Sequence, residues 1–208
     1  MTVTANPGDI VTIAADLKML LLDVDGVLTD GGIILIGKDL EAKRFDVQDG
    51  MGIGLARAAG LKVGIVTSRS SDVVQRRATE LNIDEVFQGA KHKTEVLDRL
   101  VDSYSIQASQ TAFIGDDIQD IPIMKKVGMP IAVQNAVDAV KECSCYVTRA
   151  SGGHGAVREA IEWLLDLRGD KLEAIRSRTN ASRFFLERVA TRRCRPLAYR
   201  KRLLRSRL

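Results

Sequence analysis

The stretch Met19-Leu20-Leu21-Leu22-Asp23-Val24-Asp25-Gly26-Val27 contains more information about the fold than any other part of this chain. Four consecutive apolar residues predict a short strand that is buried on both faces, and two carboxylates follow it at alternate positions. Ligands of an open parallel sheet bind beyond the carboxyl ends of its strands. Carboxylates this close repel each other unless a cation lies nearby, and Mg²⁺ prefers such oxygen ligands. The stretch therefore indicates a magnesium site, with a simple Asp-Gly turn as the alternative.

Strand-like and helical segments alternate along most of the chain. Strands are predicted at 19–22, 63–66, 85–87, 111–114, 129–133 and 146–148, and helices at 49–59, 71–81, 93–104, up to about 127, 137–141 and 155–167. Two short runs around a Gly-containing turn predict a β-hairpin over about 33–45. The alternation predicts an α/β fold with a Rossmann-like, doubly wound parallel sheet, covered by helices and carrying a hairpin insertion after its first strand.

Charge divides the 208 residues into two parts. Residues 169–208 contain 13 Lys and Arg against 3 acidic residues, whereas residues 1–168 contain 18 basic and 24 acidic residues. The division falls near Gly169, a residue type that often ends helices. It predicts a domain over 1–168 and a basic C-terminal extension over 169–208. The extension is suited to an anionic membrane or nucleic acid, and equally to a solvated segment without a partner.

The composition argues against several classes of protein. No apolar run approaches the ~20 residues of a membrane span, and the first residues lack the pattern of a secretory signal. Cys143, Cys145 and Cys194 do not have the spacing of a zinc site or of a disulfide framework. We therefore expect a cytoplasmic protein whose cysteines bind no metal and form no disulfide.

Polar residues gather at the ends of the predicted strands, which lie along one edge of a doubly wound sheet. Metal-bound carboxylates, a hydroxyl and an ammonium together suit a phosphoryl group, because cations neutralise its oxygens in the transition state. One carboxylate can attack phosphorus, and a second can protonate the leaving oxygen and then activate water. The converging residues are Asp23 and Asp25 after the first strand, Thr67 after the second, Lys93 after the third, and Asp116 and Asp117 after the fourth.

Four motifs over about residues 18–168 resemble those of the haloacid dehalogenase superfamily of phosphatases. They are Asp23-Val24-Asp25-Gly26-Val27, Thr67, Lys93 and Gly115-Asp116-Asp117. The resemblance implies that Asp23 is the nucleophile and a Mg²⁺ ligand. It implies that Asp25 is the acid/base, contacts the substrate phosphate, and gives its backbone carbonyl to the metal.

The same resemblance assigns the remaining site residues. Thr67 and Lys93 hold the phosphoryl group, and Asp116 is the third protein ligand of Mg²⁺. Asp117 and Asp120 support the site by orienting Lys93 or metal-bound water, and which of them does which stays open.

Residues 23–31, 45–53 and 152–159 are similar to a narrower family, the 3-deoxy-D-manno-octulosonate 8-phosphate phosphatases. Those enzymes release phosphate from a sugar acid destined for lipopolysaccharide. The similarity implies a capless core with a hairpin in place of a cap, and a homotetramer in which hairpins meet and a neighbour closes each active site. It also implies that the chain's end, near Lys171, reaches toward a neighbour's site.

Three residues near these motifs bear on substrate binding or differ from the usual family residue. Arg69 stands where the family has an arginine suited to bidentate pairing with a sugar carboxylate, although a surface arginine before a helix is the alternative. Ser68 replaces the usual glycine, and His154 occupies a position that is often arginine. His154 is either a loop residue or a substrate contact.

Three other classes of protein share parts of this pattern. Phosphatases of nine-carbon, sialic-type sugar-acid phosphates share most of these motifs, so they are the alternative enzyme class. A non-catalytic assembly module of the same fold would not need the intact set of acids, Thr67 and Lys93. A phosphoacceptor receiver domain has a lone acid after its third strand, whereas both acid clusters here are paired.

Overall fold

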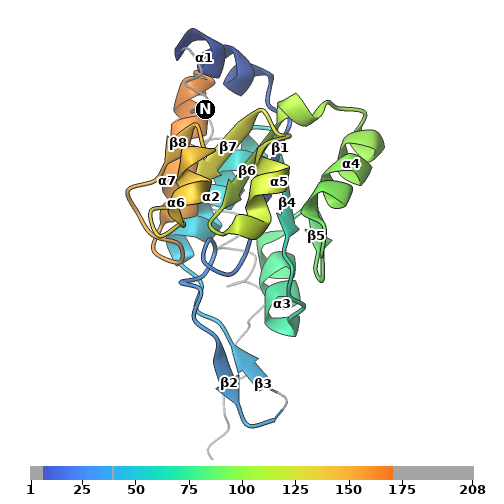
Figure 1. Cartoon of the computed structure of the whole chain (residues 1–208), viewed down its shortest axis with the longest axis vertical. Helices are drawn as coiled ribbons and strands as arrows, with labels where there is room; N and C mark the ends of the chain where they lie inside the picture. The colour runs from blue at the N-terminus through green and yellow to red at the C-terminus, as the bar shows by residue number, and fades with distance from the viewer. Residues whose placement is uncertain (1–6, 39, 171–208) are drawn as a thin grey trace, which may run out of the picture.

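Six parallel strands form the central sheet of this computed structural model, which describes residues 7–38 and 40–170 (Figure 1). The strands are β1 (Met19–Leu22), β4 (Lys62–Val66), β5 (Glu85–Phe87), β6 (Thr111–Gly115), β7 (Met129–Ala132) and β8 (Tyr146–Val147). Their order is β5-β4-β1-β6-β7-β8. The chain thus begins in the middle of the sheet, winds outward through β4 and β5, and returns to place β6 beside β1. This reversal confirms the predicted doubly wound α/β fold.

Helices cover both faces of the sheet. They are α1 (Pro7–Asp16), α2 (Val47–Ala58), α3 (Asp72–Leu81), α4 (Lys93–Tyr104), α5 (Ile121–Met124), α6 (Asp138–Glu142) and α7 (Ala156–Leu167), with short 3-10 helices η1 (Ala108–Gln110) and η2 (Ile118–Asp120). Helix α7 packs against α1 and α2, whereas α4 packs against α5. Right-handed crossovers put helices on opposite faces when the winding direction reverses. The strands are therefore covered on both sides, which explains their continuous apolar sequences.

A β-hairpin follows β1, as predicted. Its strands β2 (Ile34–Ile36) and β3 (Leu40–Ala42) pair antiparallel, with Ile34 opposite Ala42. Figure 1 shows the hairpin projecting away from the sheet. Within the described chain, the hairpin is the only regular structure between β1 and α2, and only α4 and η1 lie between β5 and β6. Neither connection holds a cap domain, in agreement with the prediction.

The structure differs from the predicted elements at two places. Helix α1 was not predicted, although it packs on α7. The single helix expected up to about residue 127 is instead η2 followed by the four-residue α5. Asp117 and Asp120 form a capping box around η2, and a proline follows at the start of α5. These residues favour a tight turn followed by a new helix start.

The end of the described chain bears on the predicted domain boundary. Helix α7 ends at Leu167, and Gly169 follows with a φ of 71°, a conformation typical of a residue just after a helix. Residues 171–208 lie outside the described residues, so the basic extension stays a prediction. Among residues 7–38 and 40–170, no helix is long and apolar enough to cross a membrane. Cys143 and Cys145 are free thiols, and Cys194 lies in the part that is not described.

Candidate active site

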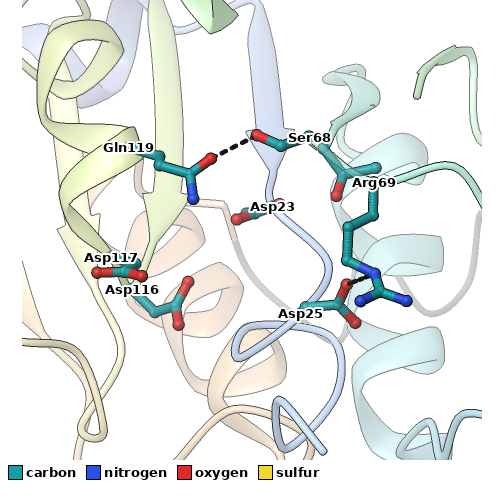
Figure 2. A pocket seen from close by; sticks show the side chains of 8 residues that line it. Asp23, Asp25, Ser68, Arg69, Asp116, Asp117 and Gln119 are labelled. Atoms are coloured by element: carbon teal, nitrogen blue, oxygen red, sulfur yellow. Dashed lines mark hydrogen bonds and ion pairs between the residues drawn. The ribbon is translucent and has the colours of Figure 1, made fainter. Parts of the chain in front are cut away.

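A pocket opens at the carboxyl ends of β1, β4 and β6 (Figure 2). Of the predicted site residues, Lys93 and Asp120 lie behind the pocket wall and the others line it. The lining residues are Asp23, Asp25, Thr67, Ser68, Arg69, Asp116, Asp117 and Gln119. The strand ends therefore bring together residues that are far apart in the sequence. Gln119 was not singled out from the sequence.

The loop after β1 is held by close backbone contacts. Gly26 has a φ of 88°, and a Cβ there would lie only 2.0 Å from Oδ2 of Asp116. Glycine is thus required for both the backbone conformation and the approach of the Asp116 carboxylate. Asn135 fixes this loop, because its side-chain amide donates to the Gly26 carbonyl at 3.0 Å and its Oδ1 accepts the Gly152 N–H at 2.6 Å. No local pattern marks Asn135, because its role depends on contacts between distant loops.

Three carboxylates crowd the ends of β1 and β6. Asp23, Asp116 and Asp120 each offer an oxygen within 4.8 Å of the others. Burial raises the pKa of Asp23 to about 6, although the charge of Lys93 opposes the increase. Burial and then the charges of Asp23 and Asp120 raise the pKa of Asp116 to about 7. Such values show that this group of acids lacks positive charge.

The acidic cluster fits Mg²⁺. Oδ1 of Asp116 is buried and has no hydrogen-bond partner among the described residues. An unpartnered buried carboxylate oxygen beside a second carboxylate is the donor set that a hard divalent ion prefers. Asp120, by contrast, is fully engaged, since Oδ1 accepts from Lys93 and Oδ2 accepts the N–H groups of Asp116 and Asp117 at 2.9 and 3.3 Å. Asp116 therefore has an oxygen available to an ion. Asp23, whose Oδ1 accepts only the neighbouring Val24 N–H in the part of the chain that the structure describes, is the nearby carboxylate that could share it.

Lys93 lies between two acids at the first residue of α4. Its Nζ is 2.8 Å from Oδ2 of Asp23 and 2.6 Å from Oδ1 of Asp120, and its side chain is 3% exposed. Burial alone would lower the pKa of Lys93, but the charges of Asp23 and Asp120 raise it above its ordinary value. The ammonium stays charged and points at Asp23. Of the two acids left open by the sequence, Asp120 is the one that contacts Lys93, whereas Asp117 accepts the Ile118 N–H at 2.7 Å.

The loop after β4 forms the opposite wall of the pocket. Thr67 is buried, and its backbone bonds to the Phe87 carbonyl and the Ala90 N–H, each at 3.0 Å. Ser68 Oγ donates to Gln119 Oε1 at 2.8 Å, which joins this loop to η2 above Asp23 (Figure 2). The serine that replaces the usual glycine therefore has a partner on the far side of the pocket.

Arg69 lies at the rim of the pocket with its side chain 42% exposed. Its Nη2 is 2.7 Å from Oε2 of Glu41 on β3, and its Nε is 3.5 Å from Oδ2 of Asp25. The buried Lys43, directly after β3, also contacts Asp25. Glu41 and Lys43 were not predicted as site residues, because nothing in the sequence shows which side chains of the hairpin turn inward. His154 contacts Arg44, with Nε2 at 2.8 Å from Nη2, and lies outside the set that lines the pocket.

Comparison with known proteins places the chain among hydrolases of this architecture. Residues 82–161 match the model of the haloacid dehalogenase-like hydrolase family. The chain is 39% identical over 166 residues to 3-deoxy-D-manno-octulosonate 8-phosphate phosphatase of Escherichia coli K12, which covers 80% of this chain and 88% of the relative. The corresponding Salmonella typhi protein is 38% identical over 165 residues, 79% of this chain and 88% of that protein.

Solved structures agree with these relatives. The Moraxella catarrhalis 3-deoxy-D-manno-octulosonate 8-phosphate phosphatase, determined in complex with magnesium, phosphate and the sugar acid, has a TM-score of 0.78 and 37% identity, over 82% of this chain and 97% of that one. A probable phosphatase from Pseudomonas syringae has a TM-score of 0.78 and 39% identity, over 82% and 96% of the two chains. The fold and the site thus define a haloacid dehalogenase-like hydrolase, and more specifically a phosphomonoesterase. Within that class, the chain belongs to the 3-deoxy-D-manno-octulosonate 8-phosphate phosphatase family.

The acidic cluster predicts a pH-dependent response to Mg²⁺. Without metal, the raised pKa of Asp116 means that the folded chain binds a proton more tightly than the unfolded chain, so stability falls as pH rises from about 4 through 7. Because metal ligands must be deprotonated, excess Mg²⁺ should raise the melting temperature more at about pH 8 than at about pH 5. Thermal unfolding followed by circular dichroism measures both effects.

Asp116→Asn separates the metal site from general salt effects. Removing one crowded charge should raise the metal-free melting temperature at pH 8 by about 2–4 °C, the shift that roughly 1 kcal/mol produces in a chain of this size. It should also remove most of the stabilisation by Mg²⁺. Asp98→Asn is the matched control, because Asp98 is exposed and, within residues 7–38 and 40–170, pairs only with Lys126. An undiminished Mg²⁺ response in Asp116→Asn would contradict the assignment.

Proposed function

We propose that this chain is a Mg²⁺-dependent phosphatase that hydrolyses 3-deoxy-D-manno-octulosonate 8-phosphate to the free sugar acid and phosphate. The observation that carries the proposal is the single pocket that Asp23, Asp25, Thr67 and Asp116 line together, with Lys93 directly behind Asp23. The 39% identity to relatives of that name supports the choice of substrate. Asp23, Asp116 and the Asp25 backbone carbonyl would hold Mg²⁺, which would supply positive charge to the phosphoryl oxygens.

Asp23 acts as the nucleophile in this proposal. Its Oδ1 accepts the Val24 N–H at 2.7 Å and its Oδ2 faces Lys93, so the carboxylate is held in one orientation. One of its oxygens attacks phosphorus and forms a phosphoaspartate while the bond from phosphorus to the sugar oxygen breaks. The Thr67 hydroxyl and the Lys93 ammonium bind phosphoryl oxygens, and Asp120 keeps Lys93 in place.

Asp25 moves the protons. Protonated, it gives its proton to the departing sugar oxygen, which leaves as a neutral alcohol. The resulting carboxylate then takes a proton from the water that attacks the phosphoaspartate. Phosphate leaves, and Asp23 returns to its free carboxylate form. Since the first step needs an acid and the second a base at the same place, one residue separate from the nucleophile suffices for both.

Arg69 is the proposed anchor for the sugar carboxylate. Its guanidinium is partly exposed at the pocket rim, near Asp25, which supports contact with an entering substrate. A guanidinium pairs with a carboxylate through two parallel hydrogen bonds, which a lysine cannot reproduce. Arg69 already pairs with Glu41, so a substrate carboxylate would compete with or extend that pair.

We further propose that the protein assembles as a homotetramer. The hairpin exposes a row of large apolar side chains, and contiguous apolar surface of this kind marks interfaces. These residues are Ile33, Ile34, Leu35, Ile36 and Leu40, each more than 50% exposed. Hairpins from neighbouring subunits that pack together would cover this surface and bring a second chain close to the pocket.

We propose a cytoplasmic location, because the free thiols of Cys143 and Cys145 suit a reducing environment. The catalytic domain spans 1–168 and the basic extension spans 169–208. The charge of the extension supports contact with an anionic surface.

Replacing the nucleophile should abolish turnover. Asp23→Asn keeps the shape of the side chain but removes the charged oxygen, so kcat should fall on the order of 10³-fold or more. Phosphate release in the presence of Mg²⁺ measures the effect, with Asp98→Asn as the control. Turnover at the wild-type rate in Asp23→Asn would exclude Asp23 as the nucleophile.

A panel of phosphorylated sugars tests which sugar acid is the substrate. We expect the largest kcat/KM for 3-deoxy-D-manno-octulosonate 8-phosphate, lower values for nine-carbon sugar-acid phosphates and plain sugar phosphates, and no turnover without Mg²⁺. Arg69→Lys should reduce the preference for carboxylate-bearing sugars by roughly 10-fold, the loss expected when a bidentate pair becomes a single contact. A larger value for the nine-carbon substrates would replace the proposed sugar. Indifference to the carboxylate would refute the role of Arg69, and no phosphate release from any compound would favour a non-catalytic module.

A charge on the hairpin should prevent assembly. Leu35→Lys puts an ammonium into the proposed apolar contact, which is costly to bury. We expect sedimentation of the full chain to give a tetramer for the wild type and smaller species for this variant. Val11→Lys, an exposed apolar position on α1 far from the hairpin, should remain tetrameric. A monomeric wild type would rule out the tetramer.

A further inference from the structure

Lys43 is buried beside the proposed acid/base Asp25. It lies on the hairpin, whose apolar side chains are mostly exposed, yet its own side chain is only 1% exposed. Its Nζ contacts Oδ1 of Asp25 and lies 3.2 Å from Oε1 of Glu41. Lysine is almost never buried without partners, because loss of water disfavours its charged form. The two carboxylates account for its burial.

Four side chains form a closed ring of alternating charge, which we term the charge ring: Asp25, Lys43, Glu41 and Arg69. Lys43 joins Asp25 to Glu41, and Arg69 joins Glu41 back to Asp25 at 2.7 and 3.5 Å. Glu41 also accepts from the Ser71 hydroxyl at 2.8 Å. Two acids and two bases leave the ring without net charge, so its partial burial is tolerated. The ring links the hairpin, the loop after β1 and the loop after β4.

The charge ring orients the Asp25 carboxyl group. One oxygen faces Lys43 and the other faces Arg69, so both are turned away from the acidic cluster. Figure 2 shows Asp25 directed toward Arg69, on the side of the pocket opposite Asp116. Lys43 is the stronger restraint, because it is buried and in close contact, whereas Arg69 is 42% exposed and 3.5 Å away.

We propose that Lys43 is a positioning residue that holds Asp25 toward the leaving oxygen and away from the metal. The proposal rests on the proposed function and deepens it. Among the residues that the structure describes, only the longer contacts to Arg69 and to the Thr29 hydroxyl, each at 3.5 Å, would hold the carboxyl group without the ammonium. It could then turn toward the divalent ion, where it would not protonate a leaving group. The hairpin therefore serves the active site of its own subunit, in addition to any contact between subunits.

The leaving group of the substrate provides the test. An alkyl phosphate needs a proton on its leaving oxygen, whereas 4-nitrophenyl phosphate releases a stabilised phenolate and needs little help. Lys43→Met removes the ammonium and keeps the length of the side chain. We expect kcat/KM of Lys43→Met to fall on the order of 100-fold for the sugar-acid phosphate and less than about threefold for 4-nitrophenyl phosphate, since general acid catalysis contributes at least this much. This constant covers only the steps through loss of the leaving group, so later hydrolysis of the phosphoaspartate does not enter it.

Glu41→Gln is the matched control for a purely structural effect. It weakens the attachment of the hairpin and frees Arg69 but leaves the contact between Lys43 and Asp25. The ratio of kcat/KM values is therefore taken between a plain sugar phosphate, which has no carboxylate for Arg69, and 4-nitrophenyl phosphate. This ratio should change less than about threefold in Glu41→Gln and fall in Lys43→Met. Lys43→Arg keeps a cation and should recover part of the alkyl phosphate activity. If Lys43→Met does not fold, as judged by circular dichroism, Lys43→Gln removes the charge while keeping a polar end, and the same ratio is measured.

Different results of these measurements would refute the role of Lys43 and the proposed function. Equal losses for both substrates in Lys43→Met, no loss for either, or the same ratio change in Glu41→Gln would overturn the role of Lys43 alone. The comparison needs only one alkyl and one aryl phosphate, so a different sugar leaves it intact. A wild type that releases phosphate from neither compound would overturn the proposed function, and this inference with it.

Discussion

The crowding of buried carboxylates at the ends of β1 and β6 is the constraint on which the site depends. β6 pairs directly with β1, and the register that puts Leu22 opposite Ile114 brings Asp23 next to the loop of Asp116. Asp120 then adds a third acid within 4.8 Å. Repulsion among these groups must be offset, and Lys93 offsets part of it by lying between Asp23 and Asp120. The unpartnered oxygen of Asp116 shows that the offset is incomplete without a cation.

The turn after β1 separates two electrostatic environments. Asp23 faces the acidic cluster and Lys93, whereas Asp25 faces the charge ring. Residues two apart in an extended segment have side chains on the same side, so the turn at Gly26 and the hairpin contacts are needed to part them. This separation gives two chemically identical carboxyl groups different partners. One is held beside a divalent ion, and the other is held by ammonium and guanidinium groups.

Local sequence was sufficient for the strands and for the residues at their ends. Short apolar or β-branched runs between helical segments predicted all six strands to within two residues, and helix α4 was predicted over the same residues that the structure shows. The order of motifs along a doubly wound sheet then placed Thr67 and Asp116 in one pocket. Glu41, Lys43, Gln119 and Asn135 were not predicted, because each acts through a contact with a distant loop. Helix α1 was missed as well, since its packing on α7 rather than a strong local pattern defines it.

The hairpin has two different surfaces, one apolar and one charged. Its outer side chains are apolar and exposed, whereas Glu41 and Lys43 turn inward and pair with the pocket loops. A three-residue strand pair is marginally stable alone, so its position must be fixed by contacts at one or both surfaces. The inner charge pairs fix it within the subunit, and they weaken wherever water competes for the charges. Packing of the outer apolar surface against another chain would exclude that water. Assembly and the orientation of Asp25 are thus linked through the same few residues.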